Sequence, residues 1–187
     1  MRADLSMPAH ARLMRQPGPV AADRFATQSD CRAVMSRITL APGLPLVEAI
    51  SAAVAAISGG ARRSAALTLL SGSFAPCVHC LAAPDPSGER LATYTPFQTT
   101  PNVEVLGGAA TLGEDLGGDP MVHCHAWFIS GAGSVAGGHL DTEKTCIGPD
   151  GLVVLISVLG LLRIRQVRDM ETNHAIFSPM GHFGVTR

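Results

Sequence analysis

Residues 121–140, MVHCHAWFISGAGSVAGGHL, contain two extended runs separated by the small residues Gly131-Ala132-Gly133. The first run, 121–129, is rich in β-branched, aromatic and other apolar residues, which favours a β-strand. The second run, 134–140, is long enough to return beside the first. The stretch therefore predicts a β-hairpin, and the rest of the chain extends this organisation.

Short strand-like runs continue on both sides of the hairpin. Residues 34–40 alternate apolar and polar side chains, the period-two pattern of a half-buried strand. Clusters of Gly, Pro, Asp and Ser, such as residues 84–88, separate the other runs. Further strands are predicted near 65–71, 76–83, 90–95, 102–107, 151–158 and 161–167.

One segment has helical spacing instead. Apolar residues recur at positions 46, 47, 50, 54 and 57, Pro45 suits a first helical turn, and Gly59-Gly60 suits a helix end. A helix is therefore predicted over about 44–58. Many short strands with one clear helical pattern predict an α+β fold, a largely antiparallel sheet with one or two flanking helices.

Length and composition favour one compact domain. The chain has 187 residues, of which 47% are hydrophobic and 16% charged. We expect a flexible N-terminal arm at 1–29, the domain at 30–178 and a C-terminal tail at 179–187. The apolar run 151–162 is about half the length of a membrane-spanning helix, so it is interpreted as a buried strand and no membrane association is expected.

Charge and cysteine content restrict partners and location. Fourteen Lys and Arg against fifteen Asp and Glu give a net charge of −1, which gives no support to nucleic-acid binding. The five cysteines are an odd number, and the first residues lack the apolar core of a secretory signal. Free thiols and a cytoplasmic location are therefore expected.

Three histidines stand out in the hairpin. His123 and His125 are two residues apart on the predicted strand, so they project from one face about 6.5–7 Å apart. The hairpin returns His139 toward them, and Gly137-Gly138 permits a close backbone approach just before it. Neutral imidazole binds zinc readily. The pattern predicts a divalent metal site of zinc type at His123, His125 and His139.

Three ligands leave a coordination position for water, a carboxylate or a small ligand. The alternative is that these are partly buried histidines with ordinary hydrogen bonds. The ion itself stays open among zinc, nickel, iron and manganese, because imidazole binds several of them. The remaining histidines lack such partners and are interpreted as surface or hydrogen-bonded residues: His10, His79, His174 and His182.

Other candidate groups have structural alternatives. Cys77 and Cys80 have redox or zinc spacing, but on a strand they would point to opposite faces. Cys124 is expected in the core. Arg163 and Arg165 share a strand face that either meets solvent or binds an anion or a neighbouring subunit's carboxylate. We expect Trp127 and Phe128 in the core or a subunit interface, and no nucleotide-binding glycine motif occurs.

The order of these features resembles a known family, the plants-and-prokaryotes-conserved (PPC) domain, also called DUF296. The resemblance covers roughly residues 30–178, and its specific part is the histidine motif. It rests on the Gly-bounded helix, Gly-Ser-Phe at 72–74, Val-Glu-Val-Leu at 103–106, His123-x-His125, Gly-Gly-His-Leu at 137–140, and the stretch from Asp169 to Phe177.

The resemblance implies a homotrimer with metal held by the three histidines. Plant relatives join this domain to AT-hooks, which is why members are labelled DNA-binding; no Arg-Gly-Arg core occurs here, so that label would be inherited by association. The histidine motif is also similar to that of α-acetolactate decarboxylase.

Three functions therefore stay open at the level of sequence. They are a binding or regulatory module with a small anionic or carbonyl ligand, a metal-dependent lyase or hydrolase, and an auxiliary DNA-binding protein. Glu104, on a predicted central strand, is the candidate proton-transfer residue for the enzyme, with an edge or interface carboxylate as the alternative.

Overall fold

The structure is a computed structural model that describes residues 16–22 and 32–180. Its described residues form one helix, α1 (Leu46–Ile57), and twelve strands. The strands are β1 (Val34–Leu40), β2 (Ala65–Phe74), β3 (Cys77–Cys80), β4 (Ala82–Pro84), β5 (Ala92–Tyr94), β6 (Gln98–Thr100), β7 (Val103–Glu114), β8 (Pro120–Ser130), β9 (Val135–Leu140), β10 (Ile147–Val158), β11 (Arg163–Asp169) and β12 (His174–Met180).

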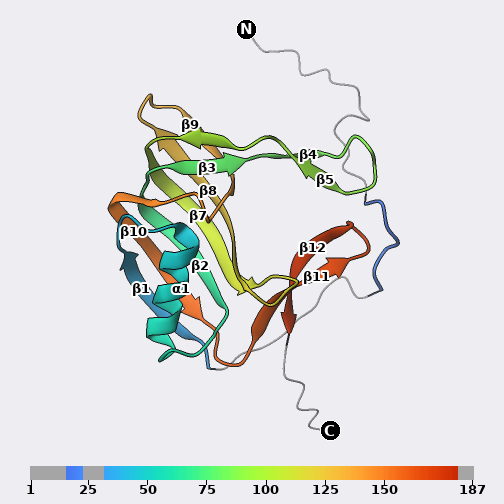
Figure 1. The fold of residues 1–187 in the computed structure, drawn as a ribbon, viewed down its shortest axis with the longest axis horizontal. Helices are drawn as coiled ribbons and strands as arrows, with labels where there is room; N and C mark the ends of the chain where they lie inside the picture. Colours follow the sequence, from blue (N-terminus) through green and yellow to red (C-terminus); the bar gives the residue numbers. More distant parts are fainter. Residues whose placement is uncertain (1–15, 23–31, 181–187) are drawn as a thin grey trace.

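Ten of these strands belong to one sheet (Figure 1). Its main path runs in the order β1-β10-β2-β7-β8-β9-β3-β6, and all neighbours on this path pair antiparallel. The β11–β12 hairpin joins the sheet through a parallel pairing with the end of β7, and β4 and β5 form a separate two-stranded sheet. The predicted α+β class with a largely antiparallel sheet is confirmed.

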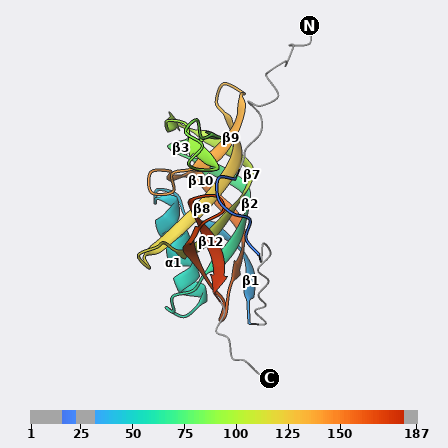
Figure 2. The ribbon, with the colours of Figure 1, turned by 90° about the vertical axis from the view of Figure 1, so that its right-hand side faces the viewer.

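Helix α1 covers one face of the large sheet (Figure 2). Its buried residues are Leu46, Ala49, Ile50 and Val54, spaced so that they form a single stripe along the helix. The helix begins directly after Pro45, and Gly59 follows its end in the left-handed conformation, with φ 65°. The predicted helix over 44–58 is confirmed to within two residues at its ends.

The two faces of the sheet differ in what covers them. The face toward α1 carries the hydrophobic core, which includes the buried Leu69, Phe128 and Ile156. The other face, which we call the open face, carries alternate residues of the same strands. Exposed apolar side chains on this face include Met35 (68%), Leu70 (41%), Leu106 (45%) and Trp127 (57%). Phe128 thus lies in the core as expected, whereas Trp127 does not.

Strand β7 is longer than predicted, because it continues through Gly107 and Gly108 to Glu114. Glycine is usually depleted in strands, so these residues suggested an end at 107. The structure gives a reason for glycine here: a Cβ on Gly107 would lie 2.9 Å from the Trp127 ring nitrogen. The strands β6 and β12 were not predicted at all.

The described part of the expected N-terminal arm, residues 16–22, lies against the β11–β12 turn. The Gly18 and Ala21 amides donate to the backbone oxygen and the side chain of Glu171, at 2.9 and 3.2 Å. The rest of the expected arm, and the tail beyond Met180, lie outside the described residues. Among the described residues, no helix has the length and apolar character needed to span a membrane.

Candidate metal centre

Strands β8 and β9 place the three histidines together on the open face. Alternation along β8 turns Cys124 and Ala126 into the core and His123 and His125 to the other side. In the register of the hairpin, His139 lies directly opposite His125. The predicted hairpin is therefore confirmed, and it brings the third imidazole to the first two.

The ring nitrogens are close enough to share one ion. His125 Nε2 lies 3.1 Å from His123 Nε2 and 3.4 Å from His139 Nδ1, and the nearest ligand atoms all lie within 4.8 Å of one another. Two nitrogens bound at 2.0–2.1 Å to a tetrahedral ion are ~3.3 Å apart. The two short separations match ligands of one ion, so the three residues could hold a metal through two Nε2 atoms and one Nδ1 atom.

Partial burial keeps the His123 and His139 rings ready to bind a cation. Desolvation of the His123 ring, with smaller contributions from His139 and His125, lowers the pKa of His123 to about 4. Desolvation and His125 also lower the pKa of His139, against an opposing effect of Asp141. A neutral ring offers the nitrogen lone pair that a metal needs. At neutral pH the rings of His123 and His139 therefore present lone pairs rather than positive charges.

Gly137 and Gly138 allow the strands around His139 to pack closely. A Cβ on Gly138 would lie 2.4 Å from the backbone oxygen of Cys80 on β3, and one on Gly137 would lie 2.8 Å from that of Ala126 on β8. Neither position accepts a side chain without separating strands. The close approach predicted for the Gly-Gly pair is observed, and it fixes the backbone that carries His139.

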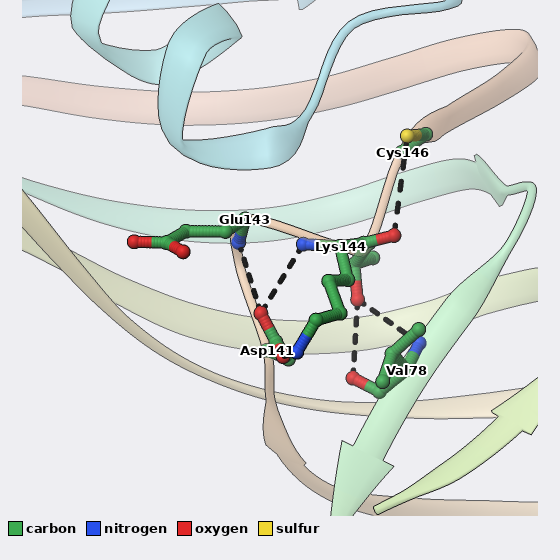
Figure 3. Close-up of polar contacts among 6 residues, drawn as sticks. Val78, Asp141, Glu143, Lys144 and Cys146 are labelled. Atoms are coloured by element: carbon green, nitrogen blue, oxygen red, sulfur yellow. Dashed lines mark hydrogen bonds and ion pairs between the residues drawn. The ribbon is translucent and has the colours of Figure 1, made fainter.

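The loop that follows β9 is held by a dense set of polar contacts (Figure 3). The Asp141 carboxylate accepts bonds from the Glu143 and Lys144 amides and pairs with the Lys144 ammonium at 2.8 Å. The buried Thr145 hydroxyl accepts from the Val78 amide and donates to the Val78 carbonyl, at 3.0 and 3.1 Å. These contacts anchor the end of the strand that carries His139.

Two aromatic side chains that sequence reasoning missed border the histidines. The Tyr94 ring on β5 lies 5.5 Å from that of His139, and the Phe177 ring on β12 lies 6.2 Å from that of His123. His174 meets Tyr94 edge-on at 6.5 Å and its Nε2 lies 2.9 Å from the Ala92 oxygen, so His174 is hydrogen-bonded as expected. No sequence pattern within β5 or β12 indicates that their side chains lie beside the histidines of β8 and β9.

Glu104, the candidate proton-transfer residue, is not brought to the histidines within one chain. It pairs with Ile129 on β8, whereas Ala109 pairs with His125. Five residues of extended strand separate Glu104 from Ala109, a distance of roughly 17 Å. The exposed Glu104 instead lines a polar depression with Ser73, Asn102 and Asp150.

The cysteines near the site are buried thiols. Desolvation raises the pKa of Cys77 to about 12, and desolvation together with Cys77 raises that of Cys124 to about 12. Burial also raises the pKa of Cys80. Thiols of this kind are poor nucleophiles at neutral pH. The expectation of Cys124 as a core residue is met.

His79 differs from the expectation of a surface or hydrogen-bonded residue. It is 6% exposed, it packs edge-on against Phe128, and its Nδ1 has no hydrogen-bond partner within the described ranges. Desolvation lowers the pKa of His79, so the ring is held neutral in the core. His10 and His182 lie outside the described residues.

On β11, Arg163 and Arg165 have partners in their own chain. Arg163 pairs with the Glu114 carboxylate, and Arg165 donates to the Leu116 oxygen at 2.9 Å. The sequence left open that a neighbouring subunit supplies a carboxylate to these arginines. In the structure, Glu114 at the end of β7 supplies one to Arg163.

The pKa of His123 predicts how acid acts on the metal-free protein. Below its ordinary pKa of 6.5 an unfolded histidine takes up a proton, whereas folded His123 does so only near pH 4. The free energy of unfolding should therefore fall as the pH drops from 6.5 to 4, by about 1–2 kcal/mol after allowance for the ring's partial exposure.

Urea unfolding of chelator-treated protein at several pH values checks this result. The variant His123→Gln should show a flatter dependence over the same window. An equal or steeper loss of stability in the variant would contradict the prediction.

Comparison with known proteins extends the description of the fold. No protein-family model matches the chain, and no curated protein matches its sequence. Solved structures do resemble it. The "putative DNA-binding protein" from Ralstonia eutropha matches with a TM-score of 0.55 and 17% identity, over 76% of this chain and 89% of that one.

Two archaeal structures give similar matches. The plant- and prokaryote-conserved (PPC) protein from Pyrococcus horikoshii has a TM-score of 0.53 and 15% identity, over 80% of this chain and 93% of that one. The metal-containing protein from Archaeoglobus fulgidus has a TM-score of 0.56 and 16% identity, over 80% and 95%.

At these identities the likeness concerns the backbone. It spans most of every chain compared. This chain has the largely antiparallel sheet that the sequence predicted. The resemblance drawn from the histidine and glycine motifs is therefore confirmed at the level of architecture. The chain has the fold of the plant- and prokaryote-conserved proteins.

Proposed function

We propose that this chain binds one divalent metal ion, most simply zinc, through His123, His125 and His139, and serves as a binding or regulatory module. The observation that carries the proposal is the spacing of 3.1 and 3.4 Å between the ring nitrogens, which matches two ligands of one tetrahedral ion. The metal-containing protein of the same fold supports it.

The ion would keep at least one coordination position for a ligand, because three donors among the described residues converge on it. A small anionic or carbonyl ligand suits such a position, since a divalent cation attracts and polarises oxygen. Tyr94 and Phe177 border the histidines and would exclude some water from the ligand. The histidines lie on the open face, so the ligand would reach the ion from that side.

The same face is proposed as the contact between three copies of the chain. A sheet face with exposed Leu70, Leu106 and Trp127 is unusual in a protein that stays monomeric. The histidines share this face, so a homotrimer would enclose the metal site near its subunit contacts. The free cysteines among the described residues suit the cytoplasm as its location.

A binding role fits the site better than catalysis by a lyase or hydrolase. Such an enzyme needs a proton-transfer group within hydrogen-bond reach of the ligand. The candidate drawn from the sequence, Glu104, lies roughly 17 Å along the strand from the residue opposite His125. The support for DNA binding is the names of two similar structures, and the net charge of −1 does not favour it.

Metal titration of the chelator-treated protein tests the proposal. We expect one zinc or cobalt ion bound per chain, and a change in the visible spectrum of the cobalt form when azide is added, because azide would enter the vacant position. Failure to retain any ion after dialysis would remove the proposal. A cobalt spectrum that azide leaves unchanged would show a closed, structural site.

A second experiment tests the DNA-binding alternative. Retention of the protein on duplex DNA that weakens as the salt concentration rises would favour that alternative.

A further inference from the structure

A cavity of 120 Å³ lies on the opposite side of the sheet from the histidines. Its walls are the second half of α1, residues 60–64 and the adjoining ends of β7 and β8. Leu112, one of its lining residues, follows Thr111, which pairs with His123. Successive residues of a strand face opposite sides, so the sheet itself separates the cavity from the metal site.

The inner surface of the cavity is mainly apolar. Val54 (2% exposed) and Leu112 (5%) form its buried wall, and the exposed Ala55 and Pro120 line its mouth. One polar group is equally deep: Ser64 is 5% exposed, and its hydroxyl oxygen accepts a bond from the Ile164 amide at 2.8 Å. Its hydroxyl hydrogen has no acceptor within residues 16–22 and 32–180, so it is available to a ligand.

The rim is positively charged. Arg62, Arg63 and Arg163 line it, and Glu114 is the one carboxylate among its described lining residues. Glu114 pairs with Arg163, whereas Arg62 and Arg63 donate to the backbone oxygens of Gly118 and Gly160. A carbonyl holds a guanidinium in position without neutralising its charge, and four of the five N–H donors stay available for an anion.

We propose that this cavity is a second ligand site, which binds a carboxylate with a short apolar chain. The chain would lie against Val54 and Leu112, while the carboxylate would meet Arg62 and Arg63 at the rim. A cavity of about 150 Å³ accommodates benzene, so this one suits a chain of roughly four or five carbons beyond the carboxylate. The apolar wall disfavours a free inorganic anion, and the rim disfavours an amine.

Titration calorimetry of the metal-free protein with sodium hexanoate tests the site, since removal of the metal excludes binding to an ion. Hexanoate should bind at one site per chain, at least tenfold more tightly than acetate, which lacks the chain, or hexylammonium, which reverses the charge. The double variant Arg62→Gln/Arg63→Gln should weaken hexanoate binding at least tenfold. Ala55→Leu, which fills the cavity from an exposed helix position, should abolish it.

Matched controls exist for both changes. Ala56→Leu adds the same side chain one residue further along the helix, outside the cavity lining, and Arg37→Gln removes a charge from β1. Both should bind hexanoate as the wild type does. The proposal is overturned if hexanoate does not bind, if acetate or hexylammonium binds equally well, or if Ala55→Leu and the double arginine variant bind it with unchanged affinity.

Discussion

Replacement of His125 by alanine is expected to remove the metal ion from the protein. His125 Nε2 is the nitrogen that lies within 3.4 Å of both other rings, so its loss leaves two donors that no longer flank a common position. Loss of an outer-shell partner alone costs 10–100-fold in metal affinity, so loss of a direct ligand should exceed about 100-fold. Competition with a chromophoric chelator measures this change.

The side chain of His125 is exposed, so its truncation should leave the fold intact, which circular dichroism can verify. The control variant His182→Ala removes an imidazole outside the described residues and should bind metal normally. Equal metal affinity in His125→Ala and the wild type would refute the three-histidine site. This outcome is independent of whether hexanoate binds to the cavity on the other side of the sheet.

Introduction of a carboxylate on the open face should separate the proposed trimer into single chains. Leu106→Asp and Trp127→Asp each place a charge on an apolar side chain that is exposed in the isolated chain. Burial of an unpaired charge in a contact costs about 3 kcal/mol or more, which weakens association more than 100-fold. Sedimentation velocity at micromolar concentration would then change from a trimeric to a monomeric species.

Two variants are needed because the Trp127 ring also covers Gly107, so its replacement perturbs local packing as well as the surface. Leu116→Asp is the matched control, since Leu116 is 44% exposed but lies in the loop between β7 and β8. It should remain trimeric. A monomeric wild type, or trimers that survive both open-face substitutions, would contradict the proposed assembly.

The elements with strong local patterns were predictable. Helix α1 has apolar residues at helical spacing between Pro45 and Gly59, and β8 and β9 flank a glycine turn. The position of His139 opposite His125 follows from hairpin geometry alone, because both strands and their turn are contiguous in the chain. That is why the candidate metal centre could be located before the structure was known.

Elements that depend on distant partners were not predictable. Strand β12 contains Pro179 and has no strict alternation, and it is a strand because β11 pairs with it across a turn at Asn173, whose φ is 56°. Strand β7 continues through two glycines because the Trp127 side chain and the β8 backbone fill the space that side chains would occupy. The strand propensity of the residues themselves gives little information where contacts with other strands determine whether a segment is a strand.

The sequence by itself determined the α+β class, the helix, the hairpin and the convergence of three imidazoles, because each depends on spacing along the chain and on the fixed periods of helix and strand. Only the tertiary structure decided that Tyr94 and Phe177 border the histidines, that Glu104 lies far from them, and that Arg62, Arg63 and Ser64 surround one cavity. The ring contacts join residues 45 and 54 positions apart. They arise from the order of the strands in the sheet and from the packing of α1, which no local pattern encodes.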